Sequence, residues 1–331
     1  MIDNKITFIL PAYNEAQNIF QLYTHIIEAI PKGLNYELLF INDGSSDETL
    51  LEMMKLAAVD ASIKYLSFSR NFGKEAAIYA GLEHATGDAV IIMDSDLQHP
   101  PTLIRELLIG YEQGYHQVVA CRNRQGESFL YRSLTGVFYK VMNRISEVEL
   151  KNGEGDFRLL SRQAVNALMQ LSESNRFSKG LYAWIGLSQK TVYYKNVERE
   201  NGHSKWSVAS LIHYALDGML SFNTKPLRVC LYLGFITIIL GLAYIGVMFI
   251  NILWKGIDVP GYFTIISSIL IVGGIQILCL GIVGEYIGRI YNEVKKRPHY
   301  IMDETNLSLN KGRVTMLKRT RSNSAKEKVH S

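Results

Sequence analysis

Cysteine is scarce in this 331-residue sequence, which contains only Cys121, Cys230 and Cys279 and no Cys-x-x-Cys pair. A disulfide scaffold and a cysteine-based zinc site are therefore excluded, and the spacing fits a reducing compartment. The first ten residues contain Asp3 and only a short apolar run, so we expect no secretory signal. Internal repeats are absent, and the only low-complexity stretch is a polar tail.

Charged residues are absent from two long segments, 229–254 and 260–284. Each exceeds the roughly 20 residues with which a helix crosses a bilayer, so we predict two membrane spans. The short connector between them predicts a hairpin whose flanking parts lie on the same side of the membrane. The predicted organisation is a soluble domain at 1–205, an amphipathic interface helix at 206–226, the transmembrane hairpin at 227–290 and a basic tail at 291–331.

Basic residues flank the two apolar segments. Lys225 and Arg228 precede the first, and Arg289 and the run 295–297 follow the second. By the positive-inside rule we expect the soluble domain and both termini in the cytoplasm, at the plasma or inner membrane. From Lys295 onward ten Lys/Arg accompany three Asp/Glu, and this tail either attracts anionic lipid headgroups or keeps the chain soluble. It does not indicate nucleic-acid binding, because no basic patch with interleaved aromatic residues accompanies it.

The first 121 residues alternate between apolar runs and segments with helical periodicity. This alternation predicts an α/β fold with a mostly parallel sheet covered by helices on both faces. The expected strands are 5–10, 36–41, 64–68, 89–93 and 117–121, and the expected helices are 15–30, 47–59, 74–85 and 101–114. The part at 126–225 is harder to parse. We predict a helix at 162–171 and an amphipathic helix at 206–222, and the second is either a membrane-interface helix or a core helix.

Polar clusters follow each of the five expected strands. In an open parallel sheet, ligands bind beyond the carboxyl ends of the strands, so these clusters together outline one site. The clusters occupy 11–15, 42–47, 69–74, 94–96 and 122–124.

Asp94 and Asp96 are the most informative pair within this outline. Two carboxylates one residue apart repel each other unless a cation or a hydrogen-bonded ligand lies near them, although a solvated turn is the simpler alternative. Their hard oxygens suit Mg²⁺ or Mn²⁺, and such a metal on a diphosphate makes the diphosphate a good leaving group. Around them, Asp43 suits a base or ribose contact, and Arg70 and Lys74 suit phosphate charge.

Four segments resemble the motifs of family-two inverting glycosyltransferases: 11–15, 42–47, 94–101 and 155–159. More narrowly, the chain is similar to the polyprenyl-phosphate glycosyltransferases, which include bactoprenol glucosyltransferases and the catalytic domain of dolichol-phosphate mannose synthase. The resemblance extends from about residue 6 to about residue 292, includes both apolar segments, and implies a GT-A nucleotide-sugar-binding fold.

The resemblance also implies roles for individual residues. Asp156, Asp94 and Asp96 match the catalytic carboxylates, and Asp96 matches the metal ligand. The implied contacts to the nucleotide sugar are Pro11, Tyr13, Glu15, Asp43, Arg70, Lys74, Asp94 and Gln98. The implied contacts to the lipid phosphate are Arg122, Arg132, Arg199 and Lys205, the last two in a segment that matches a mobile acceptor loop at 199–206.

The expected reaction is transfer of a sugar from a nucleotide diphosphate sugar to undecaprenyl or another polyprenyl phosphate, for glycosylation of the cell envelope. UDP-glucose is the favoured donor, followed by UDP-GlcNAc and then a mannose donor, with Mg²⁺ or Mn²⁺ as cofactor. A phosphate monoester has its second pKa near about 6, so the acceptor needs little deprotonation. Asp156 is therefore either a base or a group that orients the acceptor or the sugar. Family members assemble through their membrane regions, which implies a homo-oligomer.

Two other functions compete with this one. A processive polysaccharide synthase would carry a Gln-x-x-Arg-Trp motif and more spans, and the sequence lacks that motif. A non-catalytic membrane scaffold or transport subunit would not need every motif carboxylate, and a transporter would need more than one hairpin. The run 153–158 imitates a dinucleotide-binding fingerprint but lacks its final glycine. His99 is either a neighbour of the metal site or an ordinary loop histidine.

Overall fold

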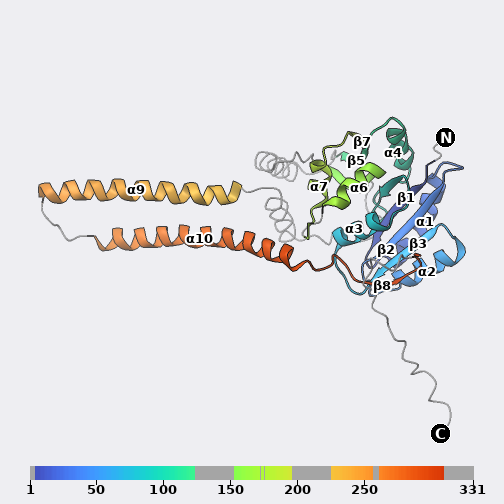
Figure 1. Cartoon of the computed structure of the whole chain (residues 1–331), viewed down its shortest axis with the longest axis horizontal. Coiled ribbons are helices and arrows are strands. Elements are labelled where there is room, and N and C mark those ends of the chain that lie inside the picture. Colours follow the sequence, from blue (N-terminus) through green and yellow to red (C-terminus); the bar gives the residue numbers. More distant parts are fainter. Residues whose placement is uncertain are drawn as a thin grey trace, which may run out of the picture. The chain divides into compact units, whose positions relative to one another are not determined.

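The computed structural model describes residues 4–123, 153–171, 173–174, 176–195, 225–255 and 261–308 (Figure 1). These residues belong to two compact units. One unit is an α/β domain, which also includes the segment from Pro298 onward, and the other contains two long helices.

A single sheet organises the α/β unit, with the strand order β7-β5-β6-β4-β1-β2-β3-β8. β1 pairs in parallel with β2 and β4, β2 with β3, and β5 with β7. β6 is antiparallel to β4 and β5, and β8 is antiparallel to β3. The predicted mostly parallel sheet is thus confirmed, with β6 inserted between β4 and β5. The strands are β1 (Ile6–Ala12), β2 (Tyr36–Asn42), β3 (Ile63–Phe68), β4 (Ala89–Ile92), β5 (Gln117–Asn123), β6 (Glu154–Ser161), β7 (Gln189–Lys195) and β8 (Met302–Thr305).

The described helices of this unit follow the predicted alternation closely. They are α1 (Ala16–Ala29), α2 (Thr49–Val59), α3 (Lys74–His84), α4 (Leu103–Glu112), α6 (Arg162–Gln170) and α7 (Ser178–Trp184). α1 shows why they form, since Ile19, Leu22 and Ile26 recur at helical spacing and are completely buried. Of the helices predicted beyond residue 126, α6 is confirmed, whereas 206–222 lies outside the described residues.

The core lies on both faces of the central strands. All seven residues of β1 and all four of β4 are buried, which explains why these strands read as continuous apolar runs. α3 packs against β1 so closely that a Cβ at Gly81 would collide with the side chain of Ile9. This close packing fixes α3 along the sheet and so determines where its first residue lies.

The chain returns to the sheet after the second long helix. Residues 298–307, here called the C-terminal strap, contain β8, which pairs with β3 at the edge of the sheet. Ser69 donates its backbone N–H to the carbonyl of Ile301 at 3.0 Å, and the Tyr65 N–H donates to Asn306 Oδ1 at 2.8 Å. The prediction of a tail from residue 291 omits this strand, because Met302-Asp303-Glu304-Thr305 is too short and too polar to show a strand pattern.

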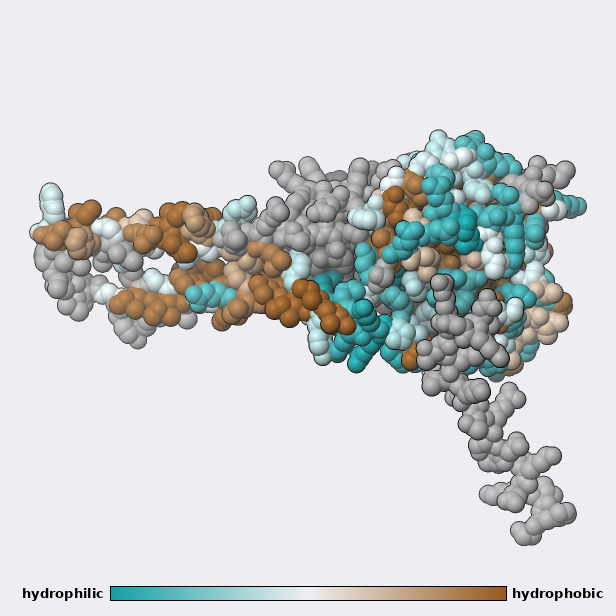
Figure 2. All heavy atoms as spheres, in the orientation of Figure 1, coloured by the Kyte–Doolittle hydropathy of each residue, from teal (hydrophilic) through white to brown (hydrophobic). Residues whose placement is uncertain are grey.

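The described part of the second unit contains α9 (Lys225–Lys255) and α10 (Tyr262–Lys295), which lie side by side (Figure 1). By length and composition, both contain segments that could cross a membrane, Tyr232–Asn251 and Ile271–Lys295. None of either segment is buried, whereas the core helix of a soluble protein would be, and Figure 2 shows hydrophobic side chains along both helices. α10 continues to Lys295, beyond the span predicted at 260–284.

Candidate active site

The predicted polar clusters meet at the edge of the sheet where the parallel strands end. β1 is followed by Tyr13, and β4 is followed by the acidic pair at 94–96. β6 runs antiparallel to β4, with Ile92 opposite Arg158, and therefore brings Asp156 to the same edge. The sequence resemblance grouped Asp156 with the acidic pair, and the antiparallel insertion of β6 is the structural reason for that grouping.

Lys74 joins these carboxylates. Its Nζ lies 2.6 Å from Asp156 Oδ2 and 2.7 Å from Asp94 Oδ1. A further contact of 2.8 Å joins Nζ to Asp94 Oδ2. Lys74 is the first residue of α3, so the helix presents the ammonium group to the end of β4 and the start of β6. The side chain predicted to hold donor phosphate thus forms ion pairs with two acidic residues in this structure.

The charges of this cluster stabilise one another. Burial alone would raise the pKa of Asp94 and of Asp156, but the Lys74 ammonium outweighs burial and holds both pKa values below the usual aspartate range. Burial would likewise lower the pKa of Lys74, but the two carboxylates hold it above its ordinary value. The arrangement keeps one cation and two anions ionised at neutral pH.

The segment around Asp94 and Asp96 forms a tight turn. Ser95 is buried between the two carboxylates and donates its hydroxyl to the carbonyl of Pro11 at 2.8 Å. Asp96 Oδ1 accepts the backbone N–H of Gln98 at 3.1 Å, and Leu97 adopts a left-handed conformation with φ 59°. The Ser95 hydroxyl thus ties this turn to β1.

His99 connects this turn to β7. Its Nε2 lies 3.4 Å from Asp94 Oδ2, and its Nδ1 lies 3.2 Å from the hydroxyl of Tyr194. The imidazole also packs on the ring of Phe157, with 4.9 Å between the ring centroids. His99 thus contacts Asp94 of the acidic pair, and its place beside a metal stays a prediction.

Asp43 has a different environment from the one expected of a free nucleotide contact. It is 4% exposed, and its carboxylate accepts the backbone N–H groups of Phe72 at 2.7 Å and Gly73 at 3.0 Å. Burial raises the pKa of Asp43 above its ordinary value. Gly44 allows this close approach, because it has φ +64° and a Cβ there would collide with the backbone of Arg70. Asp43 therefore shapes the loop before α3, in addition to any role in binding.

The other predicted nucleotide contacts surround this loop. Tyr13 is 42% exposed, so its ring is accessible for stacking. The Arg70 guanidinium lies 4.1 Å from the ring centroid of Phe72, and its Nη1 donates to the carbonyl of Asn71 at 2.9 Å. Glu15 accepts a hydrogen bond of 2.6 Å from Asn18 at the start of α1.

Gln98 Nε2 and Arg122 Nε, near this edge, are buried donor atoms that have no hydrogen-bond partner among the described residues. An unmade hydrogen bond at a buried donor is costly, so both atoms suit a ligand with acceptor oxygens. Arg122 lies opposite Tyr194 in the β5–β7 pairing. Arg132, Arg199 and Lys205, the other predicted lipid-phosphate contacts, lie outside the described residues.

Arg158 is a functional candidate to which the sequence motif assigned no role. It is 1% exposed, and its Nη2 donates to the carbonyl of Gly155 at 2.7 Å. Its guanidinium lies 3.8 Å from the ring centroid of Tyr182. A buried guanidinium is expensive to desolvate, so this one is best explained by bracing the backbone beside Asp156. The sequence signal that could have identified Arg158 is the presence of an arginine among the apolar residues of this strand.

The carboxylate oxygens at this end of the strands fit a hard divalent cation. No group of three or more His, Cys, Asp or Glu side chains close enough to share a metal occurs among the described residues. Mg²⁺ commonly binds through one or two carboxylates and completes its coordination with substrate phosphates and waters. Asp96, with Asp94 beside it, supplies the carboxylate oxygens that such binding requires.

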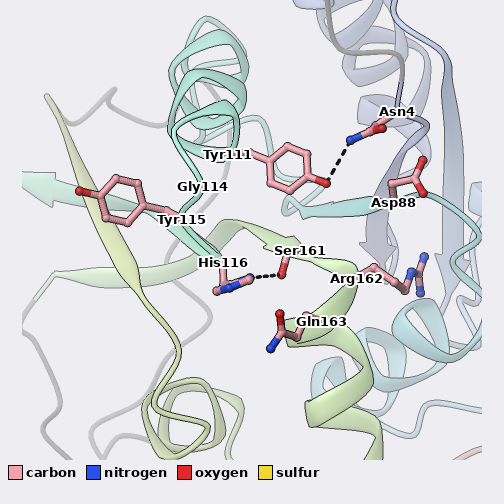
Figure 3. A pocket seen from close by; sticks show the side chains of 9 residues that line it. All are labelled: Asn4, Asp88, Tyr111, Gly114, Tyr115, His116, Ser161, Arg162 and Gln163. Atoms are coloured by element: carbon pink, nitrogen blue, oxygen red, sulfur yellow. Dashed lines mark hydrogen bonds between the residues drawn. The ribbon is translucent and has the colours of Figure 1, made fainter.

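A pocket at the other end of the parallel strands does not belong to this site. Figure 3 shows Asn4 beside Tyr111 and His116 beside Ser161, joined by hydrogen bonds of 3.3 and 3.0 Å. Asn4 precedes β1, His116 precedes β5, and Ser161 ends the antiparallel β6. The pocket thus lies at the amino ends of the parallel strands. Its lining residues are Asn4, Asp88, Tyr111, Gly114, Tyr115, His116, Ser161, Arg162 and Gln163.

Two protein-family models match the chain in succession. Residues 7–169 match the model described as glycosyl transferase family 2. Residues 225–290 match the model described as the GtrB C-terminal hairpin. The first match covers the strands that carry the acidic cluster, and the second covers α9 and most of α10.

Proteins similar over nearly the whole chain include glycosyltransferases. The glycosyltransferase CsbB of Bacillus subtilis is 57% identical over 303 residues, covering 91% of this chain and 92% of that protein. The SfII prophage-derived bactoprenol glucosyl transferase of Shigella flexneri is 42% identical over 303 residues, covering 91% of this chain and 98% of its own. Among solved structures, the mannosyltransferase PcManGT from Pyrobaculum calidifontis, in complex with GDP-Man and Mn²⁺, is 18% identical with a TM-score of 0.44, covering 61% of this chain and 58% of that one.

Proposed function

The chain belongs to glycosyl transferase family 2, and from this membership we propose that it transfers glucose from UDP-glucose to a polyprenyl phosphate with inversion at the anomeric carbon. It is a glycosyltransferase with the expected GT-A-like fold. The observation that carries the choice of substrates is the 42% identity to a bactoprenol glucosyl transferase, which extends through the C-terminal hairpin.

The hairpin supports the proposed acceptor. A polyprenyl chain stays in the bilayer, so its phosphate must be reached at the headgroup layer. α9 and α10 are long and apolar enough to hold the enzyme there, and their segments are not buried by protein. The excess of Lys and Arg at the outer ends of the two apolar segments places the α/β unit on the cytoplasmic side in this proposal. A homo-oligomer held together by the hairpins is part of the same proposal.

Donor binding is assigned to the loops between the strands and α1, α2 and α3. Tyr13 is accessible for stacking on the base, and Arg70 adds positive charge beside Asp43. A divalent cation held by Asp96, with Asp94 beside it, would neutralise the charge that develops on the departing diphosphate. Gln98, whose amide nitrogen has no partner among the described residues, can donate to a sugar oxygen.

The acceptor phosphate is anionic at neutral pH and attacks without first losing a proton. The described residues that serve it are Arg122, whose guanidinium suits phosphate oxygens, and Asp156. Lys74 keeps Asp156 ionised, so this carboxylate can accept hydrogen bonds from sugar hydroxyls and orient them toward the acceptor. In this proposal Asp156 is an orienting group rather than an obligatory base.

The test is a transfer assay with membranes that contain the full chain. Undecaprenyl phosphate is supplied with radiolabelled UDP-glucose, UDP-GlcNAc or GDP-mannose, and the lipid fraction is separated by chromatography. We expect one labelled glycolipid from UDP-glucose and far less of it from membranes carrying Asp156→Asn. A β-linked product would establish inversion, since the glucose of the donor is α-linked. Labelled polymer would instead indicate a processive synthase, and no product from any donor would contradict the proposal.

A further inference from the structure

We propose that Lys74 is a positioning residue for Asp156, whose carboxylate it holds at the site edge before either substrate binds. This inference rests on the proposed function, in which Asp156 orients the reacting groups. It differs from the sequence expectation, in which Lys74 holds the donor phosphates.

The geometry gives Lys74 an unusual place. One ammonium group lies within 2.6–2.8 Å of carboxylate oxygens from two segments, the turn after β4 and the start of β6. Asp94 and Asp156 carry like charges and would repel each other without a shared cation. The side chain of Asp156 is 16% exposed and that of Asp94 is 24% exposed, so water screens this repulsion only in part.

The backbone of Lys74 is itself held in place. Gly73, directly before it, donates its N–H to Asp43. Glu75, directly after it, accepts both the backbone N–H and the hydroxyl of Ser178, which fastens the start of α3 to the start of α7. Further along, α3 buries Ala76, Ala77 and Ile78. The ammonium group is therefore presented from a fixed point, as positioning requires.

The donor capacity of the side chain argues against a simple phosphate contact. A lysine ammonium has three N–H donors, and the contacts to Asp94 Oδ1, Asp94 Oδ2 and Asp156 Oδ2 can take up all three. A diphosphate could take over the lysine only if these carboxylates released it. Arg70 lies near the same loop and forms its cation–π contact with Phe72. It can supply positive charge to the diphosphate while Lys74 keeps its ion pair with Asp156.

The two roles of Lys74 predict different kinetics. We would measure kcat, the KM for UDP-glucose and the dissociation constant of UDP in full-length Lys74→Met, with Lys55→Met on the exposed face of α2 as a control for the loss of a lysine. Loss of positioning lowers kcat about 100-fold and changes UDP binding less than about twofold. Lys74→Arg, which keeps the charge, recovers part of the lost kcat. A raised UDP dissociation constant with unchanged kcat would overturn the proposal in favour of a phosphate contact.

A double-mutant cycle tests the pairing itself. If Lys74 acts through Asp156, adding Asp156→Asn to Lys74→Met lowers kcat little further, because the two effects are not additive. Fully additive losses would contradict the proposal. Thermal unfolding in detergent supplies a readout independent of activity. Lys74→Met should lower the unfolding temperature by leaving like charges unpaired, and Asp156→Asn in the same chain should restore part of it. Failure of that restoration also overturns the proposal, whereas an inactive wild-type enzyme would count only against the proposed function.

Discussion

Helix α3 has two contrasting surroundings along its eleven residues. Its first residue, Lys74, forms ion pairs with Asp94 and Asp156 at the active-site edge. Its second half contacts the C-terminal strap through aromatic rings and a hydrogen bond to Glu83, and Tyr79 packs on the ring of His299 with 4.4 Å between centroids. The same helix is therefore held by charge at one end and by aromatic packing at the other.

The strap contacts centre on Tyr300. Its ring stacks on Phe68 with 4.8 Å between centroids, and its hydroxyl donates to Glu83 at 2.7 Å. His84 Nε2 lies 2.9 Å from the same oxygen. The ion pairs lie beside the segments assigned to substrate binding, whereas stacking and strand pairing hold the strap on the sheet. We therefore expect the end of α3 that carries Lys74 to serve the reaction and the end that meets the strap to serve the fold.

The largest expected effect is at the charged end. Asp96→Ala should abolish transfer, with a loss of about 1,000-fold or more, because the proposed metal loses its main ligand. The protein should still fold and insert, since Asp96 lies in a surface turn. The assay is transfer to polyprenyl phosphate in buffer with excess Mg²⁺ or Mn²⁺, with Asp303→Ala in the strap as the matched control. Near-normal transfer by Asp96→Ala would contradict the assignment of Asp96 as the metal ligand.

Asp156→Asn should lower kcat about 100- to 10,000-fold, because an amide is a weaker acceptor and has no charge for Lys74 to hold. Steady-state kinetics with UDP-glucose would measure the loss. Asp88→Asn, in the pocket at the opposite edge of the sheet, is the control and should keep most activity. If both variants lose the same activity, the effect at Asp156 is general destabilisation.

At the end of α3 that contacts the strap we expect effects on stability instead. Tyr300→Ala removes the stack on Phe68 and the hydrogen bond to Glu83, at a cost of about 2 kcal/mol. The unfolding temperature should fall by several degrees, while kcat at low temperature stays within about threefold of wild type. If Tyr300→Ala lost as much kcat as Asp156→Asn and kept its stability, the two ends of α3 would not differ in function as we expect.

Alkaline pH should weaken the strap specifically. Burial and the Glu83 carboxylate raise the pKa of Tyr300 above its ordinary value, so the docked phenol resists ionisation. Its contribution is complete below the unfolded pKa near about 10 and is lost as pH rises above it. The stability advantage of wild type over Tyr300→Phe should therefore shrink between pH 9 and pH 11, measured by thermal unfolding. A constant difference across that range would contradict this assignment.

The smallest effect is expected beyond the strap. Deletion from Asn310 onward removes most of the basic tail but no residue of β8. Turnover on saturating short-chain polyprenyl phosphate should stay within about twofold, while sedimentation with anionic vesicles should weaken. Lost turnover under saturation would give the tail a role in the chemistry.

Much of this organisation was predictable because it rests on local pattern. The buried strands β1 to β4 and the helices between them follow from apolar runs and helical spacing, and the clusters after them follow from chain direction. The sequence did not predict β8, because this strand has no apolar pattern of its own and is stabilised by pairing with β3. The partners of Lys74 were also missed, since Asp94 and Asp156 are brought to it by the pairing of β4 with β6 and not by any local signal.

The place of β8 in the chain has a consequence for biosynthesis. The strand that covers the free edge of β3 is translated after both apolar helices, so the nascent sheet carries an open edge while the hairpin leaves the ribosome. Open edges pair readily with other chains. A chain that stops within the hairpin therefore lacks β8 and leaves the β3 edge without this partner strand.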